Sequence, residues 1–176
     1  MKHIRLTDSY HPLFIKAWQL YEQSFPLNER RPLPWQYDIM PHANYHFELM
    51  LQEDALTGIL LWWSFGEVRY LEHFATVPAL RGRGYGKSIL EAFVKRETRP
   101  ILLEVEPPHE EIQQRRVRFY EQCGFVLNQH FYQQPPYHQG QQPLPLLLMS
   151  YPAPITADNV AHFVAKRHPI IYRLAE

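Results

Sequence analysis

The spacing of hydrophobic and polar residues changes several times along the chain, and each change predicts a different element of secondary structure. Alternating or continuous apolar runs predict strands at residues 3–7, 45–52, 56–64, 67–77, 101–105, 125–128 and 144–151. Hydrophobic residues three and four positions apart predict helices at residues 11–25, 87–97 and 109–123, and a smaller amphipathic helix within 155–176.

The breaks between these runs predict how the elements are connected. Asp54 and Gly66 separate three consecutive strands, as expected for an antiparallel meander. Residues 26–41 contain four prolines and are predicted to form a long loop or a short irregular helix. Residues 130–143, rich in Gln, Tyr, His and Pro, are predicted to form a second long loop.

Two prolines shortly after the last predicted strand mark a boundary near the end of the chain. We therefore expect one domain over residues 1–154 and a C-terminal extension over residues 155–176. The apolar stripe of this extension must be buried, because an amphipathic helix needs a partner surface. The sequence leaves two alternatives open, namely packing against its own domain and a homodimer contact.

The composition excludes several classes of protein. Lys+Arg and Asp+Glu number 18 each, which argues against a strongly basic nucleic-acid binder. The single cysteine, Cys123, excludes an internal disulfide and a Cys-rich zinc site. No apolar run approaches the roughly 20 residues of a membrane span, and the first residues lack the apolar core of a signal peptide. We expect a cytoplasmic protein with no membrane or nucleic-acid partner and, since its ten histidines lack metal spacing, no metal.

Glycine is scarce but concentrated in one short window. Three of the seven glycines lie within residues 81–86, between a predicted strand and a predicted helix. A glycine-rich turn at a helix start leaves backbone N–H groups at the positive end of the helix dipole, which suits a phosphate group. Arg81, Arg83 and Lys87 add positive charge at the same place.

The glycine spacing distinguishes between types of phosphate-binding loop. The dinucleotide pattern G-x-G-x-x-G does not match, because the window reads G-x-G-x-G. The Walker pattern fails because its first glycine falls on Arg81. The pattern R-x-x-G-x-G does match, with Arg81, Gly84 and Gly86.

Two segments, the first of which carries this pattern, resemble one enzyme superfamily. Residues 71–90 resemble the acetyl-CoA signature of the GNAT N-acetyltransferases, and residues 118–125 (RFYEQCGF) resemble that family's FYEKLGF segment. The order of elements agrees over residues 1–151. The resemblance implies an α+β, three-layer GNAT fold. Its mixed, mostly antiparallel, twisted sheet has about seven strands, splays between strands 4 and 5 and is flanked by about four helices.

The resemblance also implies a cofactor site for acetyl-CoA as co-substrate. The pyrophosphate would lie on the loop formed by Arg81, Gly82, Arg83, Gly84, Tyr85, Gly86 and Lys87. The pantetheine arm would lie along the backbone of Phe74, Ala75 and Thr76. Tyr120 matches the family tyrosine that protonates the leaving thiolate. An asparagine seven residues earlier often contacts CoA in the family, and here the position is Gln113, so this contact is altered or lost.

The base that accepts the amine proton is less clearly indicated. Glu72 is the first candidate, with water as the alternative, because it shares a strand face with Phe74 inside an apolar run. A structural ion pair between Glu72 and an arginine is the competing interpretation. His73 is the second choice, and Glu104 with Glu106 forms a further candidate pair.

The amine acceptor, a small molecule or a peptide, is expected between the two long loops. Candidate contacts are Glu29, Arg31, Trp35, Tyr132 and Tyr137. The sequence therefore favours an acetyl-CoA-dependent N-acetyltransferase. A non-catalytic acyl-CoA-binding or sensor module on the same fold is the alternative, and Arg81 argues against a P-loop nucleotide hydrolase.

Overall fold

The computed structural model describes residues 1–174, which form two compact units. The first unit covers residues 1–101 and the second begins at residue 102. Each unit is described by itself below. The predicted boundary at residue 154 falls inside the second unit, and the division into a domain and an extension stays a prediction.

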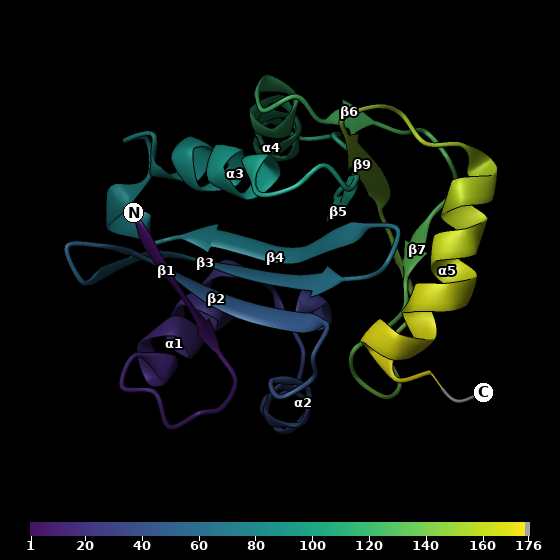
Figure 1. Cartoon of the computed structure of the whole chain (residues 1–176). Helices are drawn as coiled ribbons and strands as arrows, with labels where there is room; N and C mark the ends of the chain where they lie inside the picture. Colours follow the sequence, from purple (N-terminus) through teal and green to yellow (C-terminus); the bar gives the residue numbers. More distant parts are fainter. Residues whose placement is uncertain (175–176) are drawn as a thin grey trace. The chain divides into compact units, whose positions relative to one another are not determined.

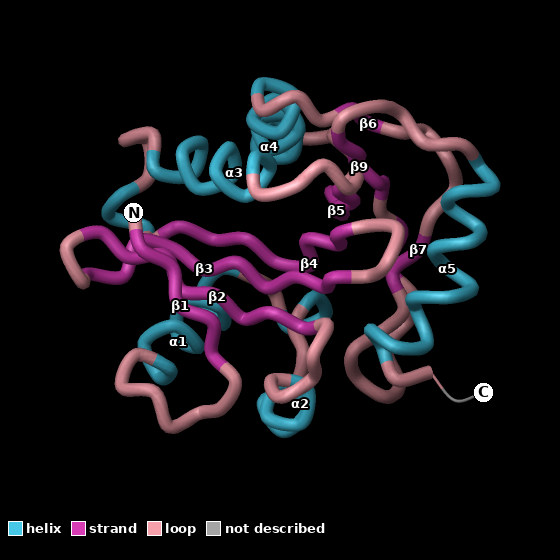
Figure 2. Tube along the Cα trace, viewed as in Figure 1, coloured by secondary structure: helices cyan, strands magenta, loops and turns pink. Residues whose placement is uncertain are grey.

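The first unit is built on four strands, β1 (Lys2–Leu6), β2 (Tyr45–Gln52), β3 (Ala55–Ser64) and β4 (Arg69–Thr76). They pair antiparallel in the order β1-β2-β3-β4, as the meander pattern predicts (Figure 1). Helices α1 (Phe14–Ser24) and α2 (Leu33–Ile39) cover one face of this sheet, and α3 (Tyr85–Lys95) covers the other (Figure 2). Because both faces are covered, β2 and β3 are buried along almost their whole length instead of at alternate residues.

Several predicted boundaries in the first unit are corrected by the structure. The first helix begins three residues later than expected, at Phe14, and the segment 26–41 contains a short 3-10 turn and α2. Helix α3 begins two residues earlier than expected, at Tyr85, because Gly84 takes a left-handed conformation and acts as its N-cap.

Gly58 permits a close approach between β3, β4 and α3. A Cβ at this position would lie 2.8 Å from the carbonyl oxygen of Ala75 and 3.1 Å from Cδ1 of Ile89. The distance to the Ala75 oxygen is shorter than a Cβ tolerates, and this oxygen belongs to the backbone, so it cannot move aside as a flexible side chain could. Strand β4 and helix α3 therefore fit against β3 only because residue 58 lacks a side chain.

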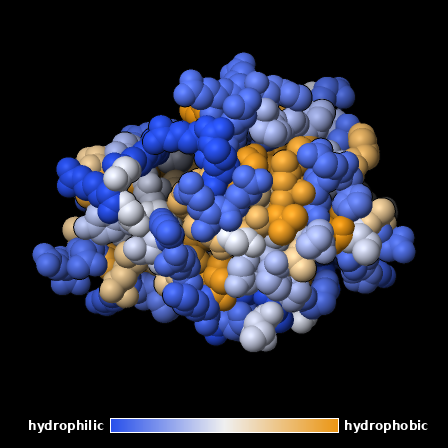
Figure 3. Space-filling model, turned by 90° about the horizontal axis from the view of Figure 1, so that it is seen from above, coloured by the Kyte–Doolittle hydropathy of each residue, from blue (hydrophilic) through white to orange (hydrophobic). Residues whose placement is uncertain are grey.

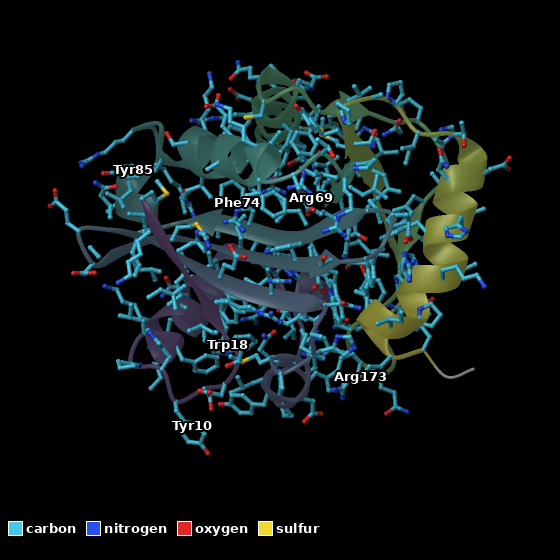
Figure 4. The ribbon with its side chains drawn as sticks, in the orientation of Figure 1. Tyr10, Trp18, Arg69, Phe74, Tyr85 and Arg173 are labelled. Atoms are coloured by element: carbon cyan, nitrogen blue, oxygen red, sulfur yellow. The ribbon has the colours of Figure 1, made fainter. Side chains whose placement is uncertain are left out.

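Arg69 closes the C-terminal end of α3 from inside the core. Its side chain is 1% exposed, and its guanidinium donates hydrogen bonds of 2.6–3.3 Å to carbonyl oxygens of Phe93, Val94, Glu97 and Arg99 (Figure 4). A helix leaves its last carbonyls without intrahelical partners, and a cation there also complements the helix dipole. The Arg69 side chain therefore supplies hydrogen bonds to carbonyls at the C-terminal end of α3, the helix that follows the glycine loop.

Replacing Arg69 with methionine is expected to lower the free energy of unfolding by about 3 kcal/mol, since it removes the guanidinium donor from one buried and three partly buried carbonyls. Lys95→Met, at an exposed position in the last turn of the same helix, is the control and should change stability by less than about 0.5 kcal/mol. Urea denaturation of both variants measures the difference. Equal stabilities would show that Arg69 does not hold the helix end.

The second unit contains β5 (Ile101–Val105) from its second residue onward, α4 (Glu111–Gln122), β6 (Val126–Leu127), β9 (Leu147–Tyr151) and α5 (Ala157–Tyr172). Strand β9 lies between β5 and β6 and pairs antiparallel with β6. The loop predicted at residues 130–143 contains β7 (Gln133–Gln134), which pairs with β8 (Leu144–Pro145). The final predicted strand is thus divided into β8 and β9.

Helix α5 is longer than the sequence predicts. It runs through Pro169 to Tyr172, although proline removes a backbone donor and disfavours a helix interior. Burial of its inner face offsets this cost, since Val160, Phe163, His168, Ile171 and Tyr172 are each at most 5% exposed. This inner face packs within the second unit, with the ring of His168 on Tyr132 and that of Tyr172 on Tyr137.

The described residues show neither a membrane helix nor a metal-binding cluster. No helix formed by residues 1–174 is long and apolar enough to span a bilayer. Over the same range, no three His, Cys, Asp or Glu side chains group in a way that could hold a metal ion. Seen from above, hydrophilic residues cover most of the surface, and apolar residues gather in limited patches (Figure 3).

Candidate active site

The glycine loop has the backbone geometry of an anion site. Gly82 and Gly84 take positive φ angles of 76° and 82°, a region that residues with a side chain rarely adopt. A Cβ at either position would meet nothing within 4 Å, so the dihedral angles, and not lack of space, require glycine. Gly86 has no positive φ and lies in the first turn of α3.

The start of α3 leaves its first amides available. The first intrahelical hydrogen bond runs from the N–H of Ser88 to the carbonyl of Gly84, so the N–H groups of Tyr85, Gly86 and Lys87 precede it. No side chain in the described part of the chain caps this helix. The loop side chains, Arg81 and Arg83, are exposed, and the positive helix end therefore faces solvent with two cations beside it.

The end of β4 lies next to this loop in the chain. Phe74, Ala75 and Thr76 are the last residues of β4, and Phe74 and Thr76 are half-buried (Figure 4). A strand end running into a glycine loop places backbone N–H and C=O groups near the first turn of α3. This arrangement suits an extended ligand with a phosphate at one end.

Tyr120 lies near the end of α4, where the chain turns back into β6. Its ring contacts those of Phe119 and Phe125 at centroid distances of 5.3 Å and 5.8 Å. Gly124, with φ of 89°, ends the helix, and the N–H of Phe125 donates to the carbonyl of Tyr120. Burial raises the pKa of Tyr120 to about 12, so near neutral pH it carries its proton and can donate it.

Gln113 has a structural role that the sequence did not reveal. It occupies the third position of α4, and its side-chain oxygen accepts hydrogen bonds from the backbone N–H of His109 and Glu110. Glu110 caps the helix reciprocally, which completes a capping box. The residue that replaces the family asparagine thus stabilises the helix start.

Glu72 forms a buried ion pair in the first unit. Its Oε1 accepts a hydrogen bond from Nη2 of Arg31 at 2.5 Å, and both side chains are fully buried. Its Oε2 accepts from Nε1 of Trp63 at 2.9 Å. The structure therefore shows the ion pair with an arginine that was the competing interpretation of Glu72.

Tyrosine hydroxyls surround the Arg31–Glu72 pair. The hydroxyl of Tyr21 accepts a hydrogen bond from the backbone N–H of Arg31 at 2.7 Å, and the hydroxyl of Tyr45 donates to Oε1 of Gln36 at 3.1 Å. Burial raises the pKa of both tyrosines well above the usual value, so both remain neutral. The Arg31 side chain, predicted to bind the acceptor, is thus held inside the unit.

The other predicted residues of the first unit lie closer to solvent or beside this network. His73 contacts the carbonyl oxygen of Glu29 through Nε2 at 2.7 Å, and burial lowers its pKa to about 4, so it is neutral and donates there. Glu29 and Trp35 are half-buried. Of the acceptor contacts predicted in this unit, Glu29 and Trp35 are thus partly exposed to solvent, whereas Arg31 is buried.

A second polar cluster surrounds Glu104 in the second unit. Glu104 is half-buried on β5, and its carboxylate accepts hydrogen bonds from the hydroxyls of Tyr132 and Tyr172 and from the amide of Gln134. The last two distances are 3.0 Å and 2.5 Å. Strand β5, residues 132–134 and helix α5 therefore meet at the Glu104 carboxylate. Glu106, the other member of the predicted pair, instead forms an ion pair with Arg116 at 2.8 Å.

His168 continues this cluster through Tyr132. Its Nε2 lies 2.8 Å from the Tyr132 hydroxyl oxygen. Burial lowers the pKa of His168 to about 4, so it is neutral and carries one ring proton. Because the Tyr132 hydroxyl donates its proton to Glu104, its oxygen is left as an acceptor, and Nε2–H of His168 donates to it.

Tyr132 and Tyr137, the predicted acceptor residues of the second unit, are 3% and 1% exposed. Their rings pack against α5, Tyr132 on His168 and Tyr137 on Tyr172, with centroid distances of 5.4 Å and 5.0 Å. Tyr132 therefore holds Glu104 and α5 together, and direct contact of either tyrosine with an acceptor stays a prediction.

Comparison with known proteins identifies the fold. The profile of the acetyltransferase (GNAT) domain matches residues 43–127. A protein of Bacteroides thetaiotaomicron assigned to the GNAT family of acetyltransferases is 36% identical, with 99% of this chain and 100% of that chain aligned and a TM-score of 0.92. A comparison with curated proteins gave no match.

More distant structures share the fold. The protein smu.2055 of Streptococcus mutans is 22% identical, covering 86% of this chain and 98% of that one, with a TM-score of 0.60. The ribosomal-protein-S18-alanine N-acetyltransferase of Escherichia coli is 17% identical, covering 90% and 97%, also with a TM-score of 0.60. The predicted GNAT fold is confirmed, and the chain belongs to the GNAT family of acetyltransferases.

Proposed function

We propose that this protein transfers the acetyl group of acetyl-CoA to a primary amine of a small molecule or a peptide. The geometry of the glycine loop carries this proposal. Two glycines with positive φ, exposed cations and the first amides of α3 suit the pyrophosphate of CoA. An aminoglycoside 6'-N-acetyltransferase of the same fold, 14% identical with a TM-score of 0.56, was solved with coenzyme A.

In the proposed reaction the amine nitrogen attacks the thioester carbonyl, and the C–N bond forms as the C–S bond breaks. Tyr120 donates its hydroxyl proton to the departing thiolate, and positioning supplies much of its effect. We infer that water, and not Glu72, first accepts the amine proton. Both oxygens of Glu72 bind strong donors, and its side chain is fully buried, so Glu72 fits better as the partner that orders Arg31.

Acetyl-CoA is expected to raise the melting temperature of the protein by about 5 to 10 °C at a hundred times its dissociation constant, whereas ATP should not. Gly84→Val should abolish this shift, because it distorts the loop. Gly140→Val is the matched control, since Gly140 also has a positive φ and open surroundings but lies outside the loop. A shift with ATP alone would favour a nucleotide-binding protein.

The activity itself is tested by measuring CoA release with a panel of amines. The name of the E. coli neighbour gives an alanine of ribosomal protein S18 as its acceptor, so a peptide with N-terminal alanine belongs in the panel beside diamines and an aminoglycoside. Release with one class of amine would establish the acetyltransferase. Stabilisation by acetyl-CoA without release for any amine would support the non-catalytic sensor.

A further inference from the structure

The C-terminal helix brings two polar side chains to a carboxylate that lies far away in sequence. Tyr172 of α5 donates a hydrogen bond to Glu104, and His168 reaches the same carboxylate through Tyr132. Both residues lie outside the segment that matches the family profile, residues 43–127. The helix therefore contributes more than apolar packing to the second unit.

The side chains that surround Glu104 form an almost fully buried layer. Tyr132, Gln134, His168 and Tyr172 are each at most 4% exposed, whereas Glu104 is half-buried. Three donated hydrogen bonds stabilise the ionised form of a carboxylate and fix its orientation. These three hydrogen bonds therefore fix the orientation of the Glu104 carboxylate.

Gln134 adds an observation that points to a ligand. Its amide nitrogen donates to Glu104, which fixes the orientation of the amide, and its oxygen Oε1 is buried with no hydrogen-bond partner among the described residues. A buried acceptor without a donor is costly, and a ligand with N–H groups would satisfy it. An ammonium group carries the N–H donors that Oε1 of Gln134 lacks, and its positive charge is complementary to the adjacent Glu104 carboxylate.

We propose that Glu104 and Gln134 bind the ammonium group of the acceptor, and that Tyr172 and the Tyr132–His168 pair are positioning residues for this site. This proposal rests on the proposed acetyltransferase activity. It makes α5 part of the acceptor site instead of an appendage. It also assigns Tyr132 an indirect role, which agrees with its burial.

The test compares Tyr172→Phe with Val160→Ala. The first change removes only the hydroxyl that contacts Glu104, and the second removes packing from the same helix at a position 5% exposed. With the amine that gives the fastest CoA release, Tyr172→Phe should raise KM for the amine about tenfold and leave KM for acetyl-CoA unchanged. Val160→Ala should lower the melting temperature and leave both KM values unchanged.

An inhibition measurement uses N,N-dimethylbutylammonium as a competitor of the amine, since a tertiary amine keeps an N–H donor and a positive charge but cannot form an amide, and n-butanol as its neutral counterpart. The wild-type protein should be inhibited by N,N-dimethylbutylammonium only, and Glu104→Gln should lose this inhibition. Equal amine KM values in Tyr172→Phe and the wild type, or equal inhibition by the two competitors, would overturn the acceptor site while leaving the acetyltransferase activity in place. Absence of CoA release by the wild type would contradict the proposed function itself.

Discussion

Replacing Tyr120 with phenylalanine is expected to lower kcat about 10²- to 10⁴-fold, the usual contribution of a positioned general acid. The departing thiolate has a proton affinity near that of an ordinary thiol, whose pKa is about 8.5. Burial raises the pKa of Tyr120 to about 12, so the phenol stays protonated over the whole physiological range. Proton transfer to a thiolate of lower pKa is unfavourable in itself, so the position of the hydroxyl beside the departing sulfur has to supply the effect. The substitution removes only the hydroxyl group of Tyr120.

Binding and folding should be preserved in this variant, because the ring still packs against Phe119 and Phe125. Steady-state kinetics gives kcat, and the acetyl-CoA thermal shift gives binding. Tyr151→Phe is the matched control, since its ring also contacts Phe125, at 5.5 Å, and it should retain full activity. An unchanged kcat in Tyr120→Phe across the amine panel would refute the role of Tyr120.

The sequence predicted the parts of this protein that depend on local backbone chemistry. Glycine at positions 82 and 84 indicated a special turn, and both residues do take positive φ angles. The run from Ile101 to Val105 between two prolines predicted β5 with its observed bounds. Such features can be read because the backbone requirement and the residue type are directly linked.

The features that the sequence did not predict depend on contacts between distant segments. Arg69 lies at the start of a strand, and nothing in its neighbours indicates that it satisfies the end of α3. Pro169 suggests a helix end, yet α5 continues because Ile171 and Tyr172 gain burial against the second unit. The partner of Glu72 was predicted as an arginine but without its identity, since Arg31 is 41 positions away.

The candidate site shows the same division. The residue types proposed for the acceptor side were appropriate for polar recognition, but three of the five, Arg31, Tyr132 and Tyr137, are almost completely buried. Sequence spacing places a residue on a loop or a strand face and does not say whether its polar atom is already bound. The sequence favours Glu72 over Glu104 as a base, and only the contacts with Tyr132, Gln134 and Tyr172 distinguish Glu104.

Replacing Arg31 with methionine is expected to lower the free energy of unfolding by about 3 to 5 kcal/mol, because it leaves the fully buried carboxylate of Glu72 without its cation. The double variant Arg31→Met/Glu72→Gln should recover part of this loss, since it leaves no uncompensated charge in the core. Urea denaturation of the wild type, both single variants and the double variant gives the coupling energy of the pair.

Arg30→Met provides the matched control for this cycle. Arg30 is the preceding residue in the chain, and its guanidinium lies 3.7 Å from Glu22, whose side chain is 48% exposed. Because solvent screens such a pair, its loss should cost no more than about 1 kcal/mol. Equal losses in Arg31→Met and Arg30→Met would show that the buried pair does not organise the first unit. If Glu72→Gln instead kept its stability but lost acetyl transfer, Glu72 would be the base, and water would not be the first acceptor of the amine proton.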